Sequence, residues 1–259
     1  MPIIQTRNIE LSYNLSGPEG APVLVLSNPI ATTQDVWMPQ LNALTPHFRV
    51  LQYDTRGHGK SEVPDGPYSI EQLGQDVLGL LDELSIREAY FCGLSLGGMT
   101  GMWLAAHHPS RIEKLVLSNC VSHIGNVDMW NDRIALVLDK GLGEIAAGQV
   151  SRWFRPGFEV MNPGVCQVFE LEIQQMSSQG YARCCAVLRD ADLRADITKI
   201  VAPVLVIGGQ YDVATSAERS KQLAAEIHLA RYVELPAGHL SNWDAPAEFN
   251  AAVLQFLMS

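Results

Sequence analysis

The amino-acid sequence predicts an α/β fold in which a mostly parallel central sheet is flanked by helices. Short apolar runs of strand length alternate with segments of helical period along most of the chain, and this alternation is typical of a parallel sheet covered on both faces. The chain has 259 residues, of which 47% are hydrophobic. This length and composition suit a single α/β domain with a large core and room for an insertion.

The first half of the chain shows the alternation clearly. In Ile70–Leu84 apolar residues recur every three or four positions, which indicates a helix, and Pro109 follows the end of another helical segment. The expected strands are Val23–Ser27, Arg49–Tyr53, Ala89–Cys92 and Leu115–Cys120, and the expected helices are Trp37–Leu44, Ile70–Leu84 and Leu96–His107.

Residues 122–191 interrupt this rhythm. The segment favours helix, has no clear buried strand, and contains the large apolar side chains of Met129-Trp130, Trp153-Phe154 and Met176. A long insertion between two strands at one end of a sheet is a natural lid; the alternative is a helical elaboration that completes the core. We therefore expect a core over residues 1–121, a helical lid over 122–191, and a second part of the core over 192–259.

The alternation returns after the insertion. The expected strands here are Val204–Ile207 and Tyr232–Leu235, and the expected helices are Ala217–Ile227 and Phe249–Leu257.

Composition excludes several classes of function. The chain carries 18 basic and 28 acidic residues, a net charge of −10, which disfavours nucleic acid as a partner because phosphate binding needs a basic surface. The N-terminus lacks a signal-peptide pattern, and no apolar run approaches the roughly 18–20 residues of a membrane span. Five cysteines, an odd number without a C-x-x-C pair, suit a reducing cytoplasm better than a disulfide framework or a zinc site.

One motif points to covalent catalysis. Gly93–Gly97 reads G-x-S-x-G between the expected strand Ala89–Cys92 and a helix, which is the context of a nucleophile elbow. Ser95 must then occupy a sharp, strained turn, and side chains two positions before or after it would collide across that turn. The pentapeptide alone is a weak signal, since an ordinary strand-to-helix turn would also fit it.

A serine nucleophile needs a base, and the base needs an orienting acid. Asp212 and His239 each follow one of the two late strands, in the chain order Ser, Asp, His that sheet-based hydrolases use. Because ligands bind beyond the carboxyl ends of parallel strands, we expect Ser95, Asp212 and His239 to converge as a catalytic triad. The competing acids, Asp190 and Asp192, precede a strand and are disfavoured.

The same reasoning identifies an oxyanion hole made of two backbone N–H groups. One donor is expected from Leu96, the residue after the nucleophile. The other is expected from the loop after Val23–Ser27, where Pro29 has no N–H and Ile30 is the best candidate. Such a donor is worth about 2.7–4 kcal/mol at the transition state.

Several blocks of the chain together resemble the α/β-hydrolase superfamily over nearly its whole length. They are Ser27–Ile30, Tyr53–Ser61, Cys92–Gly98, Gly209–Asp212 and Gly238-His239. A narrower resemblance, to the 3-oxoadipate enol-lactonases, rests on five blocks: the S-N loop, Tyr53–Ser61, Phe91–Ser95, Arg152–Phe154 and Ala191–Arg194. Those enol-lactonases read S-N-S-L-G-T where this chain has Ser27–Thr32, S-N-P-I-A-T, so the oxyanion loop departs from the pattern.

The resemblance implies an α/β-hydrolase fold with a lid and hydrolysis of 3-oxoadipate enol-lactone in the β-ketoadipate pathway, without cofactor, metal or obligate protein partner. Ser95 would attack the lactone carbonyl, and His239 would activate water to release 3-oxoadipate. The substrate carries a carboxylate, for which Arg133 is the first candidate and Trp130 a candidate pocket wall; a surface arginine and a lid-core tryptophan are the alternatives. Arg56 and His58 are interpreted as scaffold beneath the site.

Other functions fit the same motifs. The triad does not separate a lactonase from a carboxylesterase, a carbon–carbon bond hydrolase or a hydrolase with perhydrolase activity. A ligand receptor of this fold, which can retain a full triad, is a remote alternative, and so is a non-catalytic binding protein. Dehalogenases and epoxide hydrolases of the fold use an aspartate where Ser95 stands.

Overall fold

A computed structural model describes all 259 residues of the chain and contains an eight-stranded sheet in the order β1-β2-β4-β3-β5-β6-β7-β8. The strands are β1 (Ile3–Gln5), β2 (Glu10–Ser16), β3 (Val23–Ser27), β4 (Arg49–Tyr53), β5 (Ala89–Leu94), β6 (Ile112–Ser118), β7 (Val204–Gly209) and β8 (Ala230–Leu235). β2 pairs antiparallel with both β1 and β4, and every other pairing is parallel. The predicted fold class is confirmed.

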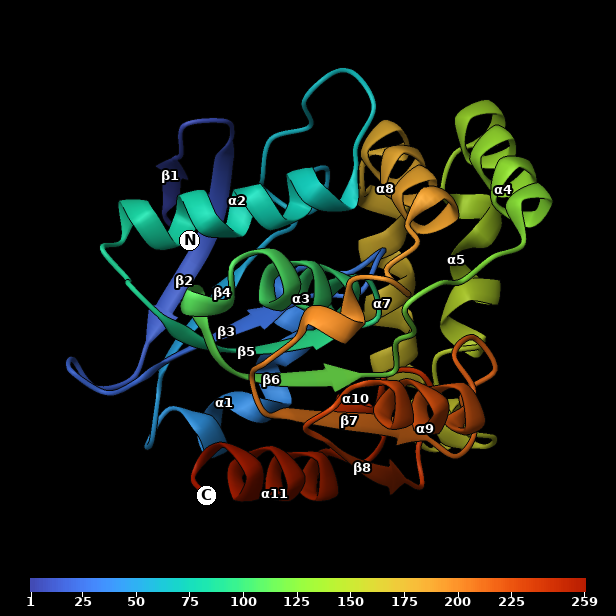
Figure 1. Cartoon of the computed structure of the whole chain (residues 1–259). Coiled ribbons are helices and arrows are strands. Elements are labelled where there is room, and N and C mark those ends of the chain that lie inside the picture. Colours follow the sequence, from blue (N-terminus) through green and yellow to red (C-terminus); the bar gives the residue numbers. More distant parts are fainter.

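Eleven α-helices surround this sheet (Figure 1). They are α1 (Met38–Leu44), α2 (Ile70–Glu83), α3 (Leu96–His107), α4 (Val127–Lys140), α5 (Gly143–Ser151), α6 (Phe158–Met161), α7 (Pro163–Gln175), α8 (Ser178–Asp190), α9 (Ala217–Glu226), α10 (Ser241–Asp244) and α11 (Pro246–Leu257). α2 begins with a capping box, in which the Ser69 hydroxyl accepts from the N–H of Gln72 (3.2 Å) and the Gln72 side chain accepts from the N–H of Ser69 (2.9 Å). This exchange satisfies two otherwise unpaired donors.

Every strand and helix expected from the sequence is present. β3, β4 and α3 have the expected bounds, and the other elements differ from them at one or both ends. The strand expected at Leu115–Cys120 spans Ile112–Ser118 instead, so the two residues after it belong to a loop. The sequence reasoning missed β1 and β2 at the sheet edge. These strands are only partly buried, so they lack the continuous apolar run by which the central strands are found.

Helices α4–α8 lie between β6 and β7 and form a group beyond the ends to which the arrows of β5, β6 and β7 point (Figure 1). A narrow neck joins the group to the rest of the chain. There the N–H of Leu193 donates to the carbonyl of Ser122 (2.8 Å), and His123 and Asp192 form an isolated antiparallel bridge. The helical insertion therefore enters and leaves at one point.

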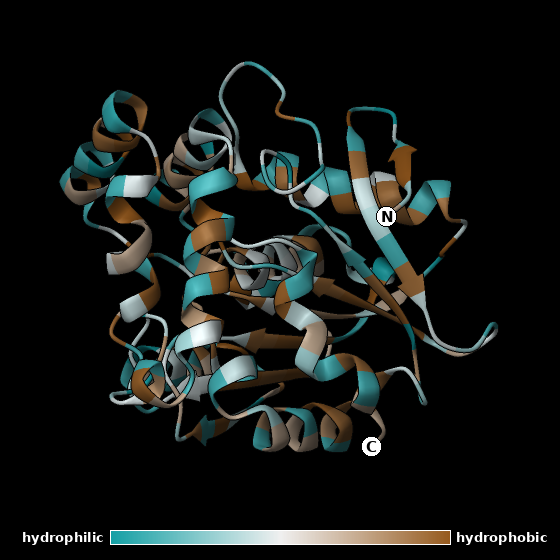
Figure 2. Cartoon of the chain, turned by 180° about the vertical axis from the view of Figure 1, so that it is seen from behind, coloured by the Kyte–Doolittle hydropathy of each residue, from teal (hydrophilic) through white to brown (hydrophobic).

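The core is continuous across the sheet. The central strands are apolar along their length, whereas the surrounding helices alternate between polar and apolar faces (Figure 2). β7 is buried at all six positions, as expected of a strand covered on both faces. All five cysteines are free and buried. The longest helices have 14 residues, and none is long and apolar enough to cross a membrane.

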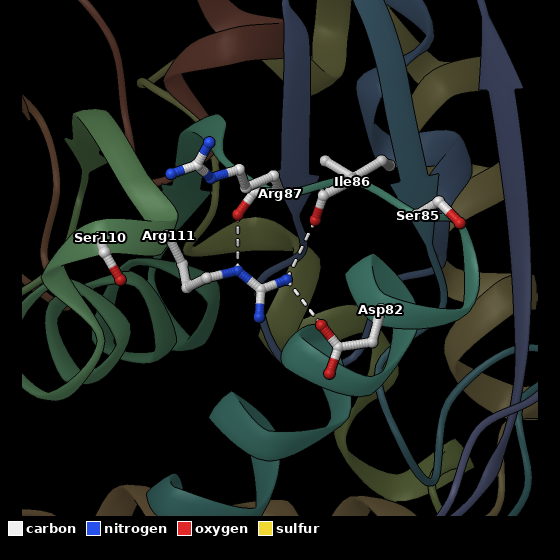
Figure 3. A pocket seen from close by; sticks show the side chains of 6 residues that line it. All are labelled: Asp82, Ser85, Ile86, Arg87, Ser110 and Arg111. Atoms are coloured by element: carbon white, nitrogen blue, oxygen red, sulfur yellow. Dashed lines mark hydrogen bonds and ion pairs between the residues drawn. The ribbon is translucent and has the colours of Figure 1, made fainter.

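One surface pocket lies at the amino ends of β5 and β6, the edge opposite the carboxyl ends (Figure 3). Arg111 there donates to the carbonyls of Ile86 (3.0 Å) and Arg87 (2.7 Å) and pairs with Asp82 (2.8 Å). The side chain of Arg87 points away from this cluster (Figure 3). Since Arg111 connects the end of α2 to the segment before β5, we interpret the pocket as a joint between α2, β5 and β6.

Candidate active site

Ser95 occupies the turn between β5 and α3 with φ 54° and ψ −113°, a conformation that non-glycine residues adopt only under constraint. The turn is held by hydrogen bonds from the N–H of Ser95 to the carbonyl of Ser118 (2.9 Å) and from the N–H of Met99 to the carbonyl of Ser95 (3.0 Å). A Cβ atom at Gly93 would collide with the carbonyl oxygen of Gly97. The glycine requirement inferred from the motif is therefore present in the geometry.

Asp212 lies on the loop after β7 and accepts five hydrogen bonds. Its Oδ2 accepts from His239 Nδ1 (2.9 Å), Asn119 Nδ2 (2.9 Å) and Thr215 Oγ1 (2.7 Å). Its Oδ1 accepts from the N–H groups of Ala214 (2.8 Å) and Thr215 (2.9 Å). Burial alone would raise the pKa of Asp212, but the charge of His239 and these hydrogen bonds outweigh burial and lower it to about 2. The carboxylate is thus ionised at neutral pH.

His239 follows β8 and is buried. Its Nδ1–H is held by Asp212, which leaves Nε2 to take a proton. Its backbone is fixed from both sides, because the N–H of Gly238 donates to Asp244 Oδ2 (2.7 Å) and the N–H of Leu240 donates to the carbonyl of Trp153 (2.9 Å). His239 and Ser95 line the same cavity without a hydrogen bond between their side chains; such contacts commonly tighten when a substrate binds.

Asn119 is a supporting residue that the sequence reasoning missed. It has a left-handed φ of 48° and donates from Nδ2 to Asp212 and to the carbonyl of Gly238 (3.1 Å). Its Oδ1 accepts from the hydroxyls of Ser118 (2.7 Å) and Ser241 (2.6 Å). It therefore links the loop that carries Asp212 to the loop that carries His239. The available signal was its place directly after β6, at the same edge of the sheet.

The two expected oxyanion donors are free. Neither Ile30 nor Leu96 donates its N–H to another group of the protein. Leu96 is the first residue of α3, where no intrahelical acceptor exists. The loop that carries Ile30 is held by Asn28, whose Nδ2 donates to the carbonyl of Tyr53 (2.8 Å) and whose Oδ1 accepts from Trp37 Nε1 (2.9 Å). The arrangement leaves both N–H groups available for a ligand oxygen.

The cavity beside Ser95 and His239 has a volume of about 400 Å³ and is lined by both the sheet loops and the helical insertion. Among its lining residues are three arginines, Arg133, Arg152 and Arg219, and no aspartate or glutamate. None of the three forms a salt bridge. In a chain of net charge −10, this concentration of unpaired positive charge indicates an anionic ligand.

Two of these arginines share one neutral acceptor. Arg133 Nη1 donates to Gln149 Oε1 (2.9 Å) and to the hydroxyl of Tyr181 (3.2 Å), and Arg152 Nη2 donates to the same Gln149 oxygen (3.2 Å). Burial and the charge of Arg133 lower the pKa of Arg152. Because an amide oxygen does not neutralise two guanidinium groups, a bound carboxylate would be stabilised between them.

The remaining cation is Arg219 on α9. Its guanidinium donates to the backbone carbonyl of His123, where the helical insertion begins. Sequence reasoning missed both Arg219 and Arg152, since neither belongs to a pattern that separates a pocket arginine from a surface one.

The other residues considered from the sequence also have clear positions. Trp130 lines the cavity and is also buried among the core residues, so the structure gives it both of the positions considered from the sequence. The competing acids are engaged elsewhere: Asp190 pairs with Arg189 (2.7 Å) and Asp192 with Arg194 (2.5 Å). Neither acid lines the cavity.

Comparison with known proteins identifies the family of this chain. The family model described as alpha/beta hydrolase fold matches residues 22–161. The chain is 40% identical to 3-oxoadipate enol-lactonase 2 of Acinetobacter baylyi, over 96% of this chain and 94% of that protein, and 36% identical to 3-oxoadipate enol-lactonase 1 of the same organism, over 92% and 90%. The crystal structure of the enol-lactonase from Burkholderia xenovorans LB400 superposes with a TM-score of 0.98 at 42% identity, covering 100% of both chains.

Proposed function

Because the chain belongs to the alpha/beta hydrolase family, among the 3-oxoadipate enol-lactonases, we propose that it opens 3-oxoadipate enol-lactone to 3-oxoadipate in aromatic-compound catabolism. The fold and the relatives make it a hydrolase of esters or lactones. The observation that carries the finer proposal is the cavity itself, which combines Ser95 and His239 with three unpaired arginines and no acid. A neutral ester would not use that charge.

Acylation begins at Ser95. His239 Nε2 takes the hydroxyl proton as Oγ attacks the lactone carbonyl carbon, and Asp212 stabilises the resulting imidazolium. The carbonyl oxygen becomes an oxyanion, which the N–H groups of Ile30 and Leu96 stabilise. When the intermediate collapses, the ring carbon–oxygen bond breaks, and the enol oxygen leaves with a proton from His239. The enol then becomes the ketone by tautomerisation, and the acyl group stays on Ser95.

Deacylation repeats these steps with water. His239 takes a proton from water, and the resulting hydroxide oxygen attacks the ester carbonyl while the same two N–H groups stabilise the oxyanion. Collapse breaks the bond to Ser95 Oγ, which regains its proton from His239. The product leaves as a dicarboxylate, and each proton transfer passes through His239.

The helical insertion determines which substrate the site accepts. We assign the substrate carboxylate to Arg133, with Arg152 beside it, and the wall of the cavity to Trp130. In this proposal residues 122–191 act as a lid over a core made of 1–121 and 192–259. The five free cysteines support a reducing, cytoplasmic location.

The test is a comparison of three substrates with purified protein: the enol-lactone, a neutral lactone of the same ring size, and p-nitrophenyl acetate. We expect the enol-lactone absorbance to disappear with a kcat/KM far above the values for the other two. Faster turnover of the neutral compounds would contradict the proposed substrate and assign the site to a general esterase.

A further inference from the structure

His58 lies under the oxyanion loop and accepts a hydrogen bond there. The N–H of Ala31 donates to His58 Nε2 (3.1 Å), and His58 Nδ1 donates to the carbonyl of Arg56 (3.2 Å). The ring is buried, and burial lowers the pKa of His58 to about 4, so it is neutral with its proton on Nδ1 at neutral pH. Ala31 has a left-handed φ of 67° and directly follows Ile30. His58 therefore accepts from the N–H of Ala31, which is next to the N–H of Ile30 that is left free for the oxyanion.

The turn Asp54–Ser61, which contains His58, is bound to the oxyanion loop at a second point. Asp54 Oδ1 accepts from the N–H of Gln34 (2.8 Å), while its Oδ2 accepts from the N–H of Lys60 (2.9 Å). One carboxylate thus joins the end of the loop to the far side of the turn. With contacts at both places, the turn and the loop are expected to move as one unit.

The same turn touches the lid on its other side. Gly57 and Gly180, near the start of α8, approach so closely that a Cβ atom at Gly180 would collide with the carbonyl oxygen of Gly57. Cys184 Sγ, one helical turn further along α8, donates to the carbonyl of Arg56 (3.7 Å), which also accepts from His58. A shift of α8 would therefore displace the turn that carries His58.

We propose that the turn Asp54–Ser61 couples the seating of lid helix α8 to the oxyanion hole, with His58 as the positioning residue that aims the N–H of Ile30. The inference rests on the proposed serine-hydrolase mechanism and adds a residue that does not touch substrate. It predicts that disturbing either contact of the turn lowers kcat on any acyl substrate, including one with no carboxylate, because the oxyanion forms with all of them.

The first test compares His58→Phe with His58→Gln, using p-nitrophenyl acetate and the enol-lactone. Phenylalanine fills the space without an acceptor, whereas glutamine offers an oxygen to Ala31 and an N–H to Arg56. We expect His58→Phe to lower kcat by about 10- to 100-fold on both substrates with KM little changed, part of the value of one oxyanion donor. We expect His58→Gln to recover most of that loss.

The second test perturbs the lid side of the turn. Gly180→Ala adds a methyl group against Gly57, and Gly164→Ala is a matched control near the start of lid helix α7, where a Cβ atom meets nothing within 4 Å. We expect Gly180→Ala to lower kcat on p-nitrophenyl acetate about 10-fold or more and Gly164→Ala to leave it unchanged. Melting temperatures of both variants separate this effect from unfolding.

Two results would overturn the coupling. One is an unchanged kcat in folded His58→Phe, and the other is an equal kcat on p-nitrophenyl acetate in Gly180→Ala and Gly164→Ala. Failure of the proposed substrate looks different: the unaltered chain would turn over the enol-lactone slowly while ester hydrolysis stays readable. The ester arm therefore decides the role of His58 whatever the natural substrate is.

Discussion

The two walls of the cavity are held in opposite ways. On the sheet side, Asp212 accepts five hydrogen bonds and His239 is fixed through its side chain and its neighbours. On the lid side, Arg133 and Arg152 share one amide oxygen and have no carboxylate partner. On the sheet side, the many hydrogen bonds hold the reacting groups in one geometry. On the lid side, arginines without a carboxylate partner keep their charge available for a ligand. The comparison supports our proposal that the sheet loops carry the chemistry and that the lid chooses the substrate.

The largest effect is expected from removing the nucleophile. Ser95→Ala should lower kcat by about 10⁶-fold on the enol-lactone and on p-nitrophenyl acetate alike, because no other group in the cavity takes its place. The measurement is steady-state turnover of both substrates, with circular dichroism to show that the variant folds. Retained turnover of either substrate would mean that the sheet wall does not carry the chemistry.

A smaller loss is expected from the acid. Asp212→Asn keeps the shape of the loop but removes the charge that holds the His239 tautomer and stabilises its cation, so kcat should fall by about 10⁴-fold on both substrates. The control is Asp192→Asn, which alters an acid paired with Arg194 outside the cavity. Similar losses in the two variants would contradict the assignment of the acid.

The burial of His58 makes the free energy of unfolding depend on pH. Below its ordinary pKa of 6.5 the unfolded chain binds a proton at this residue, whereas the folded chain does not until about pH 4. The unfolding free energy should therefore fall as pH drops from 6.5 to 4, by about 3 kcal/mol, and then level off. Urea titrations of the unaltered chain and of His58→Gln across this range measure it, and equal slopes for the two proteins would show that His58 is not buried as a neutral ring.

Loss of an arginine on the lid side is expected to impair turnover of the anionic substrate alone. Arg133→Gln should raise KM for the enol-lactone by about 10- to 100-fold, the value of a charge-assisted hydrogen bond, and leave p-nitrophenyl acetate unaffected. Arg87→Gln makes the same change of charge at the distal joint (Figure 3) and serves as the control. An unchanged KM in Arg133→Gln would move the carboxylate site to another arginine.

The sheet wall could be predicted from sequence because its rules are local. Ser95 is marked in the sequence by its flanking glycines. Asp212 and His239 each follow a predicted strand, and the carboxyl ends of parallel strands meet at one edge of the sheet. The pocket arginines could not be predicted in the same way. Arg152, on the helical insertion, and Arg219, on α9 of the core, meet in the cavity only through the packing of helices, and no periodicity marks them. Strands β1 and β2, the first two at one side of the sheet, were missed for a related reason, since half-buried strands lack a continuous apolar run.

One ratio tests most directly whether the sheet loops carry the chemistry while the lid selects the substrate. It is the kcat/KM for the enol-lactone divided by that for the neutral lactone, measured in the unaltered chain and in the double variant Arg133→Gln, Arg152→Gln. We predict that the ratio falls by about 100-fold or more in the double variant while kcat on the neutral lactone is retained. A ratio that stays constant, or a kcat that falls equally on both substrates, would contradict the account.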